Sequence, residues 1–335
     1  MIRRLTNEGA LRMSSLTNLE PRPAVMPVPA ARVAVLLPCY NEEVAIARTV
    51  AGFAAALPGA TIYVYDNNST DRTMAVASAA GAIVCSERRQ GKGAVVRRMF
   101  ADIDADVYVM ADGDATYDAG AAAAMVARLL DGQLDMVVGA RVSDERLAYR
   151  RGHVFGNRLL TGLLASMFGQ SFSDILSGYR VFSRRFVKSF PVRSAGFEIE
   201  TEISVHALEL AMPVAEMRTT YGARPEDSLS KLSTWRDGFR ILRTMFNLYR
   251  YERPVQFFGI IALVLALVAV GLGAPLLQTY DATGLVPRLP TAVLIVGIMI
   301  IAVLSLFTGL ILDTVTEGRR EVKRLIYLQS DAPGA

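Results

Sequence analysis

The chain has 335 residues, a net charge of +4, two cysteines and two histidines. This length allows one catalytic domain of about 200–250 residues and one appendage. Arginine and lysine are scattered except beside two long apolar runs, which argues against a nucleic-acid-binding surface and indicates a membrane surface. Two cysteines without C-x-x-C spacing argue against a disulfide scaffold or a structural zinc site, and they fit a reducing cytosol.

Residues 1–31 lack the apolar core of a signal peptide. They contain Arg3, Arg4 and Arg12 at the start and several prolines after residue 20. Because proline breaks a helix, we expect a flexible N-terminal tail.

From residue 32 onward, apolar strand-like runs alternate with helical segments. Strands are expected at 33–38, 61–65, 81–85, 107–111 and 134–139, and helices follow each of the first four. Asn41 is expected to cap the first helix, and Ser69 or Thr70 the second. Alternation with short connections predicts the α/β fold class, with a mostly parallel sheet covered by helices on both faces.

The strand at 107–111 ends in Asp112-Gly113-Asp114. Ligands of open parallel sheets bind beyond the carboxyl ends of the strands. Two carboxylates this close raise each other's pKa unless a cation lies between them. Hard oxygen ligands suit Mg²⁺ or Mn²⁺ that also holds substrate phosphates. An Asp-Gly turn is the simpler alternative, but the position at a strand end favours the metal site.

Two further polar positions indicate a nucleotide cleft. Asp66 at the end of the second strand could accept a hydrogen bond from a base or ribose, or it could cap a helix. Lys92 in Gly91-Lys92-Gly93 could offer its charge to a diphosphate. The spacing of a P-loop is missing, and no G-x-G-x-x-G follows the first strand, so a dinucleotide-binding Rossmann domain is not expected.

Six motifs occur in a specific order along the chain: Pro38-x-Tyr40-Asn41-Glu42-Glu43, Asp66-Asn67-Asn68-Ser69-Thr70-Asp71, Gly91-Lys92-Gly93, Asp112-Gly113-Asp114, Ser177-Gly178-Tyr179-Arg180 and Ser230-Lys231-Leu232. This set resembles the family 2 glycosyltransferases of GT-A fold, in particular the polyprenyl- and dolichyl-phosphate sugar synthases such as dolichyl-phosphate mannose synthase. The resemblance covers residues 31–242. It implies inverting transfer of a sugar from a UDP- or GDP-linked donor onto a membrane polyprenyl phosphate, with Mg²⁺ or Mn²⁺ as cofactor.

The resemblance also implies roles for individual residues. Those implied to bind the nucleotide-sugar are Pro38, Tyr40, Glu42, Asp66, Asn68, Lys92, Asp112 and Gly113. Those implied to hold the metal are Asp112 and Asp114. Those implied to act in catalysis are Lys92, Asp114, Asp174 and Arg180. Those implied to receive the acceptor phosphate are Arg141, Arg158 and Lys231, and a guanidinium fork suits phosphate oxygens.

Some roles stay open, and the pattern departs from the family at two places. Asp174 could act near the reaction centre or pair structurally with Arg180. Glu200 either complements the dipole of its helix or lies on the acceptor side of the cleft. Asn67-Asn68 stands where many relatives have Asp-Gly, and Thr116 stands where many have Gln as a further metal-site residue.

Two apolar runs near the C-terminus predict a membrane hairpin. Residues 255–277 and 291–312 contain no charged side chain, and about 20 apolar residues span a bilayer. Arginines and a lysine flank the pair on its outer ends, so the positive-inside rule places both ends of the hairpin, the catalytic domain and both termini in the cytoplasm, at the plasma (inner) membrane. Residues 231–253 are expected to form an interfacial amphipathic helix, and 316–335 a cytoplasmic tail.

Other functions are weighed against this one. A polysaccharide synthase would carry Q-x-x-R-W and more membrane spans, whereas the only tryptophan lies in Ser233-Thr234-Trp235-Arg236. A membrane transferase that acts on a lipid or glycan hydroxyl is the main alternative. A non-catalytic nucleotide-sugar-binding membrane protein would be expected to lose its acidic site residues. Packed hairpins would also allow a homo-oligomer.

Overall fold

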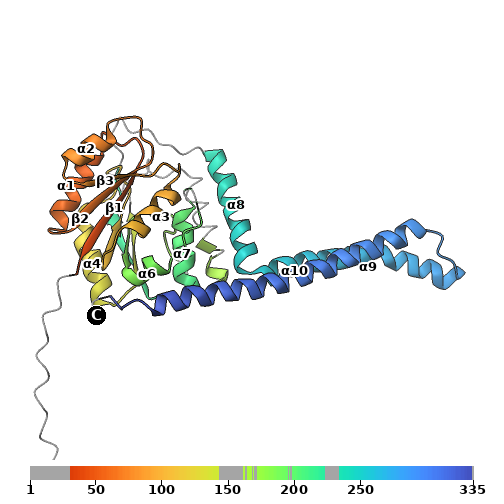
Figure 1. The fold of residues 1–335 in the computed structure, drawn as a ribbon. Coiled ribbons are helices and arrows are strands. Elements are labelled where there is room, and N and C mark those ends of the chain that lie inside the picture. Colours follow the sequence, from red (N-terminus) through yellow and green to blue (C-terminus); the bar gives the residue numbers. More distant parts are fainter. Residues whose placement is uncertain are drawn as a thin grey trace, which may run out of the picture.

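The computed structural model describes residues 31–142, 161–162, 164–167, 169, 172–194, 196, 198–222 and 234–333, with the backbone alone for 234–242. The N-terminal tail expected at 1–31 therefore lies outside the described residues, apart from residue 31. Its catalytic part is built on one sheet (Figure 1). The strands are β1 (Val33–Cys39), β2 (Thr61–Asp66), β3 (Ile83–Ser86), β4 (Val107–Met110), β5 (Met136–Val142), β6 (Arg180–Ser183) and β7 (Val214–Thr220), in the order β3-β2-β1-β4-β6-β5-β7.

The sheet is parallel except for β6. Strands β1 to β4 pair in parallel, as do β5 and β7, whereas β6 runs antiparallel to both β4 and β5. The reversed strand has a consequence for the site: Arg180 at the start of β6 lies opposite Met110 at the end of β4. The loop before β6 is thereby brought to the carboxyl end of β4. The predicted α/β class is confirmed, with β6 as the exception to parallel pairing.

Helices cover both faces of the sheet (Figure 1). They are α1 (Ile46–Ala56), α2 (Thr73–Ala79), α3 (Lys92–Asp102), α4 (Ala122–Asp131), α6 (Arg184–Ser189) and α7 (Ile199–Glu209), with a short 3₁₀ turn, η1 (Ala119–Ala121), before α4. Because successive strand residues point to opposite faces, Leu36 of β1 joins the core beneath α3, α6 and α7, while Leu37 joins the core beneath α1, α2 and α4.

The expected helix caps are wrong. The first helix begins at Ile46, and Asn41 has a left-handed backbone (φ 53°) with its Oδ1 accepting from the Thr70 amide at 2.8 Å. The second helix begins at Thr73, whose amide donates to Asp71 Oδ1 at 3.0 Å. Asn41 therefore connects the loops that follow β1 and β2. Its side chain accepts from the loop after β2, so it does not cap the first helix.

Two helices leave the catalytic part as an antiparallel pair: α9 (Pro254–Thr283) and α10 (Leu289–Leu328) (Figure 1). Both are long and apolar enough to cross a membrane, and only 11% of each apolar stretch is buried within the chain. Small residues line their contact: Ala262, Ala269, Ala302 and Gly309 are buried. A Cβ on Gly309 would lie 3.1 Å from Phe258 Cβ and 3.3 Å from the Pro254 carbonyl oxygen. The two helices of the hairpin are therefore held together by close backbone approach, a packing that is common between membrane helices.

We expect Gly309→Val to destabilise the hairpin by about 1–3 kcal/mol, because the added methyl groups overpack the contact with α9. Gly297→Val on the same helix is the matched control, since a Cβ there meets nothing within 4 Å. Thermal unfolding of both variants in detergent measures the difference. Equal melting temperatures would contradict the close packing.

An amphipathic helix was expected before the hairpin and a tail after it. Helix α8 (Thr234–Glu252) lies where an amphipathic helix was expected, and it runs across the direction of the hairpin, as a helix lying on a membrane surface would (Figure 1). In the segment expected as a C-terminal tail, residues 316–328 continue α10. This part of α10 packs against α6 of the catalytic domain.

His206 of α7 is buried between the rings of Phe186 and Phe190, with Nε2 3.1 Å from the Ser189 hydroxyl. Burial, with smaller effects of Lys323 and Arg193, lowers its pKa to about 3. The unfolded histidine titrates near 6.5, so below that pH only the unfolded chain binds the proton. Stability is therefore fully present above pH 6.5 and is lost as the pH falls toward 3.

We expect the wild-type free energy of unfolding to fall by about 1.5 kcal/mol between pH 6.5 and 5 through this residue. His206→Gln removes the titrating group, so its stability should change less over the same range. Denaturant unfolding across this pH series is the measurement. Parallel profiles for the two proteins would show that His206 is not the group responsible.

Candidate active site

The loops beyond the carboxyl ends of β1, β2 and β4 meet the loop before β6 and the first turn of α7. Asp66 ends β2, Asp112 and Asp114 follow β4, and Lys92 opens α3. Glu200 lies in the first turn of α7. The predicted convergence of strand-end side chains is thus present among the described residues.

Lys92 lies between two carboxylates from distant parts of the chain. Its Nζ bonds to Asp112 Oδ1 and lies 2.5 Å from Glu200 Oε1. Burial by itself lowers the pKa of Lys92, but attraction to Asp112 and Glu200 outweighs this effect and raises the pKa above its usual value. The Lys92 side chain is 9% exposed, whereas that of Asp112 is 31% exposed. The site therefore holds a fixed positive charge behind a carboxylate that still faces solvent.

Glu200 was only a secondary candidate from the sequence. It lies 108 residues from Lys92, and its helix-dipole position gave an adequate local explanation. The structure makes it the second partner of Lys92, buried at 5% exposure. In the sequence, the one indication of a role for Glu200 was its place in a run of acids at the start of a helix, in the second half of the catalytic region.

Gly178 approaches the Lys92–Asp112 pair so closely that a side chain does not fit. A Cβ at this position would lie 2.9 Å from Asp112 Oδ2, 3.1 Å from Lys92 Nζ and 3.3 Å from the Tyr117 hydroxyl. The Gly178 amide donates to that hydroxyl at 2.9 Å. Sequence reasoning used Gly178 only as part of a motif and did not find Tyr117 at all. Both shape the wall of the site beside Asp112.

Asp114 is buried and held by its own loop. Its Oδ1 accepts from the Thr116 hydroxyl at 2.6 Å and from the Thr116 amide at 3.2 Å. Thr116, the departure from the family pattern, therefore orients Asp114. Gly113 between the two aspartates is required by packing, because a Cβ there would lie 2.3 Å from Cys39 Sγ. The loop is thus pressed against the end of β1.

Asp66 carries a buried oxygen that lacks a partner. Its Oδ2 accepts from the Ser69 amide at 3.0 Å, as a turn-forming aspartate does. Its Oδ1 has no hydrogen-bond partner within the described part of the chain. An unpaired buried acceptor costs about 1–3 kcal/mol. This oxygen is therefore suited to a donor group of a ligand, in addition to the turn that Oδ2 makes.

Asn67 and Asn68 connect the end of β2 to the loop before α3. The Asn67 amide donates to the Glu87 and Arg89 carbonyls at 2.9 Å, and its Oδ1 accepts from the Gly91 amide at 2.7 Å. Asn68, expected to bind the donor, uses its amide on the Arg88 carbonyl at 2.9 Å and on Gln90 at 3.0 Å. The pair therefore fixes the loop that presents Lys92.

The remaining donor-side residues belong to β1 and the loop after it. Pro38 lies in β1 opposite Tyr65, and Tyr40 is the first exposed residue beyond the strand. Glu42 is buried, and its amide donates to the Thr73 hydroxyl at 2.8 Å. These three residues line the same edge of the sheet as Asp66.

Asp174 pairs with Arg141, which corrects the expected alternative of a pair with Arg180. The guanidinium of Arg141 donates from Nε at 2.7 Å and from Nη2 at 2.8 Å to the two carboxylate oxygens. It also lies over the Tyr221 ring at 5.4 Å. Arg141 at the end of β5 is thus oriented by Asp174, in a bidentate geometry.

Arg180, expected to act in catalysis, is fully buried in β6. It donates to the Ser177 carbonyl at 2.9 Å and to the Ile175 carbonyl at 2.6 Å, and burial lowers its pKa to about 10. Its role in the structure is to hold the loop that carries Gly178. Arg158 and Lys231, the other expected acceptor-phosphate residues, lie outside the described residues.

The donor set fits a divalent metal that shares its coordination with a substrate. No group of three or more His, Cys, Asp or Glu side chains with metal-site geometry occurs in the described ranges. Asp112 and Asp114 nevertheless offer hard oxygen ligands at the cleft. Mg²⁺ is commonly held by one or two carboxylates, with water and substrate phosphates completing its shell.

Known glycosyltransferases are similar to this chain. The family described as "Glycosyl transferase family 2" matches residues 34–190. Glycosyltransferase AglJ of Haloferax volcanii is 37% identical over 258 residues, covering 76% of this chain and 84% of AglJ. Low-salt glycan biosynthesis hexosyltransferase Agl6 of the same organism is 33% identical over 254 residues, 72% of this chain and 61% of Agl6.

A solved structure shares the fold. It is glucosyl-3-phosphoglycerate synthase from Mycobacterium tuberculosis in complex with Mn²⁺, UDP and glucosyl-3-phosphoglycerate, with a TM-score of 0.53 and 24% identity, covering 64% of this chain and 80% of that one. The strand-end carboxylates, the mixed sheet and these similarities lead to one assignment. The chain belongs to glycosyltransferase family 2.

Proposed function

We propose that this protein is an inverting glycosyltransferase that moves a sugar from a UDP- or GDP-linked donor onto a polyprenyl phosphate in the membrane. The proposal rests on one observation: the same chain contains a polar site at the strand ends and an apolar helical hairpin. A strand-end cleft holds Asp112, Asp114 and Lys92, and an apolar hairpin long enough to cross a bilayer follows it. The product would be a polyprenyl-phosphate sugar, the donor for later glycan synthesis at the cell envelope.

The donor side of the cleft suits a nucleoside diphosphate. Asp66 Oδ1 at the end of β2 offers a buried acceptor to a base or ribose, and Asp112 presents its partly exposed carboxylate after β4, on the other side of β1. Lys92 supplies a positive charge toward the departing diphosphate, which lowers the cost of charge that develops there. When bound at Asp112 and Asp114, Mg²⁺ or Mn²⁺ would act as a Lewis acid on the diphosphate oxygens.

The acceptor chemistry needs little help from the protein. A phosphate monoester has a second pKa near 6, so at neutral pH it is largely a dianion and requires no general base. Its oxygen attacks the anomeric carbon, the bond from that carbon to the diphosphate breaks, and the configuration inverts. The protein therefore has to align the phosphate oxygen with the anomeric carbon. Arg141, oriented by Asp174, is the described arginine suited to hold the phosphate; Arg158 and Lys231 are proposed to assist it.

The relatives support the class of reaction, since their names describe a glycosyltransferase and a hexosyltransferase of glycan biosynthesis. The hairpin supports an acceptor whose tail stays in the bilayer. We place the protein in the plasma (inner) membrane, with the catalytic domain and both termini on the cytoplasmic side, and homo-oligomers through the exposed hairpin faces are compatible with this arrangement.

The test uses the full chain in vesicles that contain polyprenyl phosphate, supplied with labelled UDP- or GDP-sugars and Mn²⁺. We expect label in an acid-labile lipid fraction with one of the two nucleotides. Label on diacylglycerol or in polymer would instead select transfer to a hydroxyl. Nucleotide-dependent thermal stabilisation without any transfer would select a binding protein.

A further inference from the structure

The last part of α10 belongs to the hairpin and to the catalytic domain at once. The helix is continuous from Leu289 to Leu328, although its apolar stretch ends near Leu312. Beyond that point it runs beneath the catalytic domain, away from the tip of the hairpin (Figure 1). A membrane anchor needs no such extension, so the contacts of this part of α10 indicate a role beyond anchoring.

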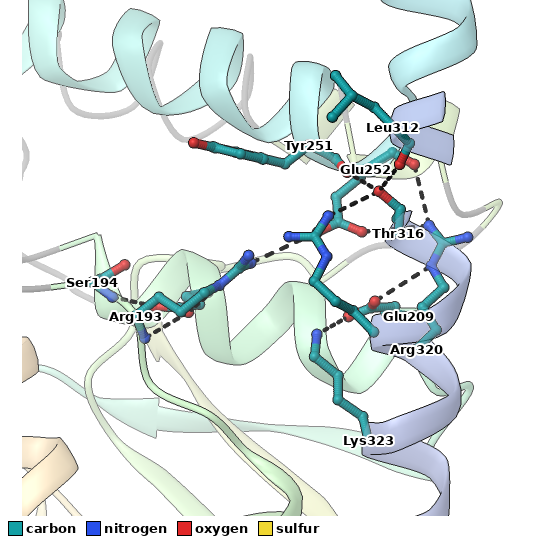
Figure 2. Close-up of polar contacts among 11 residues, drawn as sticks. Arg193, Ser194, Glu209, Tyr251, Glu252, Leu312, Thr316, Arg320 and Lys323 are labelled. Atoms are coloured by element: carbon teal, nitrogen blue, oxygen red, sulfur yellow. Dashed lines mark hydrogen bonds and ion pairs between the residues drawn. The ribbon is translucent and has the colours of Figure 1, made fainter. Parts of the chain in front are cut away.

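Five charged residues, which we call the ionic cluster, join three elements at the base of the hairpin: Arg193, Glu209, Glu252, Arg320 and Lys323 (Figure 2). Glu209 ends α7 of the catalytic domain, and Glu252 ends α8. Both carboxylates are nearly inaccessible, at 3% and 4% exposure of the side chain.

Two cations of α10 bind these acids. Lys323 Nζ lies 2.5 Å from Glu209 Oε2, and Arg320 Nε lies 3.3 Å from Glu209 Oε1. Arg320 Nη2 also lies 3.4 Å from Glu252 Oε2. Buried charges lose much of their hydration and are retained only where opposite charges meet them closely. The cluster therefore favours one arrangement of α7, α8 and α10.

A second contact between α10 and the catalytic domain lies at Tyr327, seven residues beyond Arg320. The Tyr327 hydroxyl donates to Asp135 Oδ2 at 2.7 Å, and the Arg185 guanidinium lies over the Tyr327 ring at 4.8 Å. Asp135 is fully buried directly before β5. At the rise of an α-helix, Arg320 and Tyr327 are about 10 Å apart. Two contacts spaced along one stiff helix fix its direction as well as its position.

We infer that the ionic cluster and Tyr327 are positioning residues: they hold the catalytic domain at one height and tilt above the bilayer, so that the strand-end cleft meets a membrane-bound acceptor. This inference rests on the proposed function for the identity of the acceptor. The residues touch no reacting atom. They act by fixing the direction of α10. Their loss should therefore lower the rate of transfer to a bilayer-bound acceptor far more than the rate of transfer to a soluble one.

The test compares four α10 variants with the wild-type chain. Lys323→Met removes one cation of the cluster, and Tyr327→Phe removes the bond to Asp135 while keeping the ring. Arg324→Met is the matched control, since it makes the same kind of change one position away on a side chain that is 55% exposed and that lies 3.9 Å from Glu317. Lys323→Arg keeps the charge and should restore the wild-type behaviour.

Transfer is measured with a long-chain polyprenyl phosphate in vesicles and with a short-chain, water-soluble one in detergent. We expect Lys323→Met and Tyr327→Phe to lower kcat/KM for the vesicle acceptor by about tenfold or more, as misalignment does. Turnover of the soluble acceptor should stay within about twofold of wild type, as should the nucleotide-induced rise in melting temperature, because the cleft is unchanged. Equal losses with both acceptors, or none with either, would overturn the inference.

A readout independent of transfer separates this inference from the proposed function. Energy transfer from a dye on exposed Ala127→Cys, in a Cys85→Ser background, to labelled lipid headgroups reports the distance between catalytic domain and bilayer. We expect a broader or shifted distance in Lys323→Met and an unchanged one in Arg324→Met. An unchanged distance in both overturns the positioning role. A shift in a protein whose wild type makes no lipid-linked sugar supports the positioning role and overturns the proposed function.

Discussion

Replacing Asp114 by asparagine is expected to reduce sugar transfer by at least about 100-fold, a loss typical of removing a group that stabilises charge in the transition state. Asparagine has nearly the same shape and can still accept the hydrogen bond from the Thr116 hydroxyl, which lies 2.6 Å from the carboxylate. The substitution therefore removes the negative charge while leaving the buried loop packed. A metal that relies on this oxygen would lose a ligand.

Asp118→Asn is the control for Asp114→Asn, since Asp118 is an exposed acid in the same loop whose carboxylate accepts from the Gly120 amide at 2.9 Å. Asparagine fills that capping role equally well. Transfer rates and the rise in melting temperature with UDP or GDP and Mn²⁺ are measured for both. An Asp114→Asn protein that keeps most of its activity and its metal-dependent stabilisation would refute the metal assignment.

Gly178→Ala is expected to lower kcat/KM by about 100-fold, in line with the cost of displacing a catalytic group by an ångström. The new methyl carbon would lie 2.9 Å from Asp112 Oδ2 and 3.1 Å from Lys92 Nζ. Because contacts this short are not tolerated, Asp112 and Lys92 must shift or the loop must lift away from Tyr117. Either movement alters the part of the cleft proposed to face the donor.

Gly222→Ala offers the matched comparison for Gly178→Ala. Among the described residues, its added carbon would meet only the Thr116 carbonyl oxygen, at 3.9 Å, which is an ordinary contact. Steady-state transfer and nucleotide affinity distinguish the two variants, and thermal unfolding verifies that each is folded. If alanine at the two positions has the same effect, the close approach of Gly178 to Asp112 has no functional consequence.

The sequence predicted the features that depend on local patterns. The strands are short apolar runs, and the hairpin is two long uncharged runs, so period and length are sufficient to find them. Asp112 and Asp114 could be placed at the cleft because a strand ends where the apolar run stops. The helix starts were misplaced because Asn41 accepts from the Thr70 amide and Asp71 accepts from the Glu43 amide across the two loops, which a local capping rule does not include.

Only the tertiary structure decided which charged side chains pair with one another. Lys92 could be assigned to a diphosphate from its own motif, but its pairing with Glu200 spans 108 residues. The choice of Arg141 over Arg180 as the partner of Asp174 likewise depends on which strand reverses. The acids that hold the last part of α10 are also distant in sequence, from 68 residues for Glu252 and Arg320 to 192 for Asp135 and Tyr327. Such pairs form because folding buries charges that then require an opposite charge nearby, and no local pattern states which one packing will bring there.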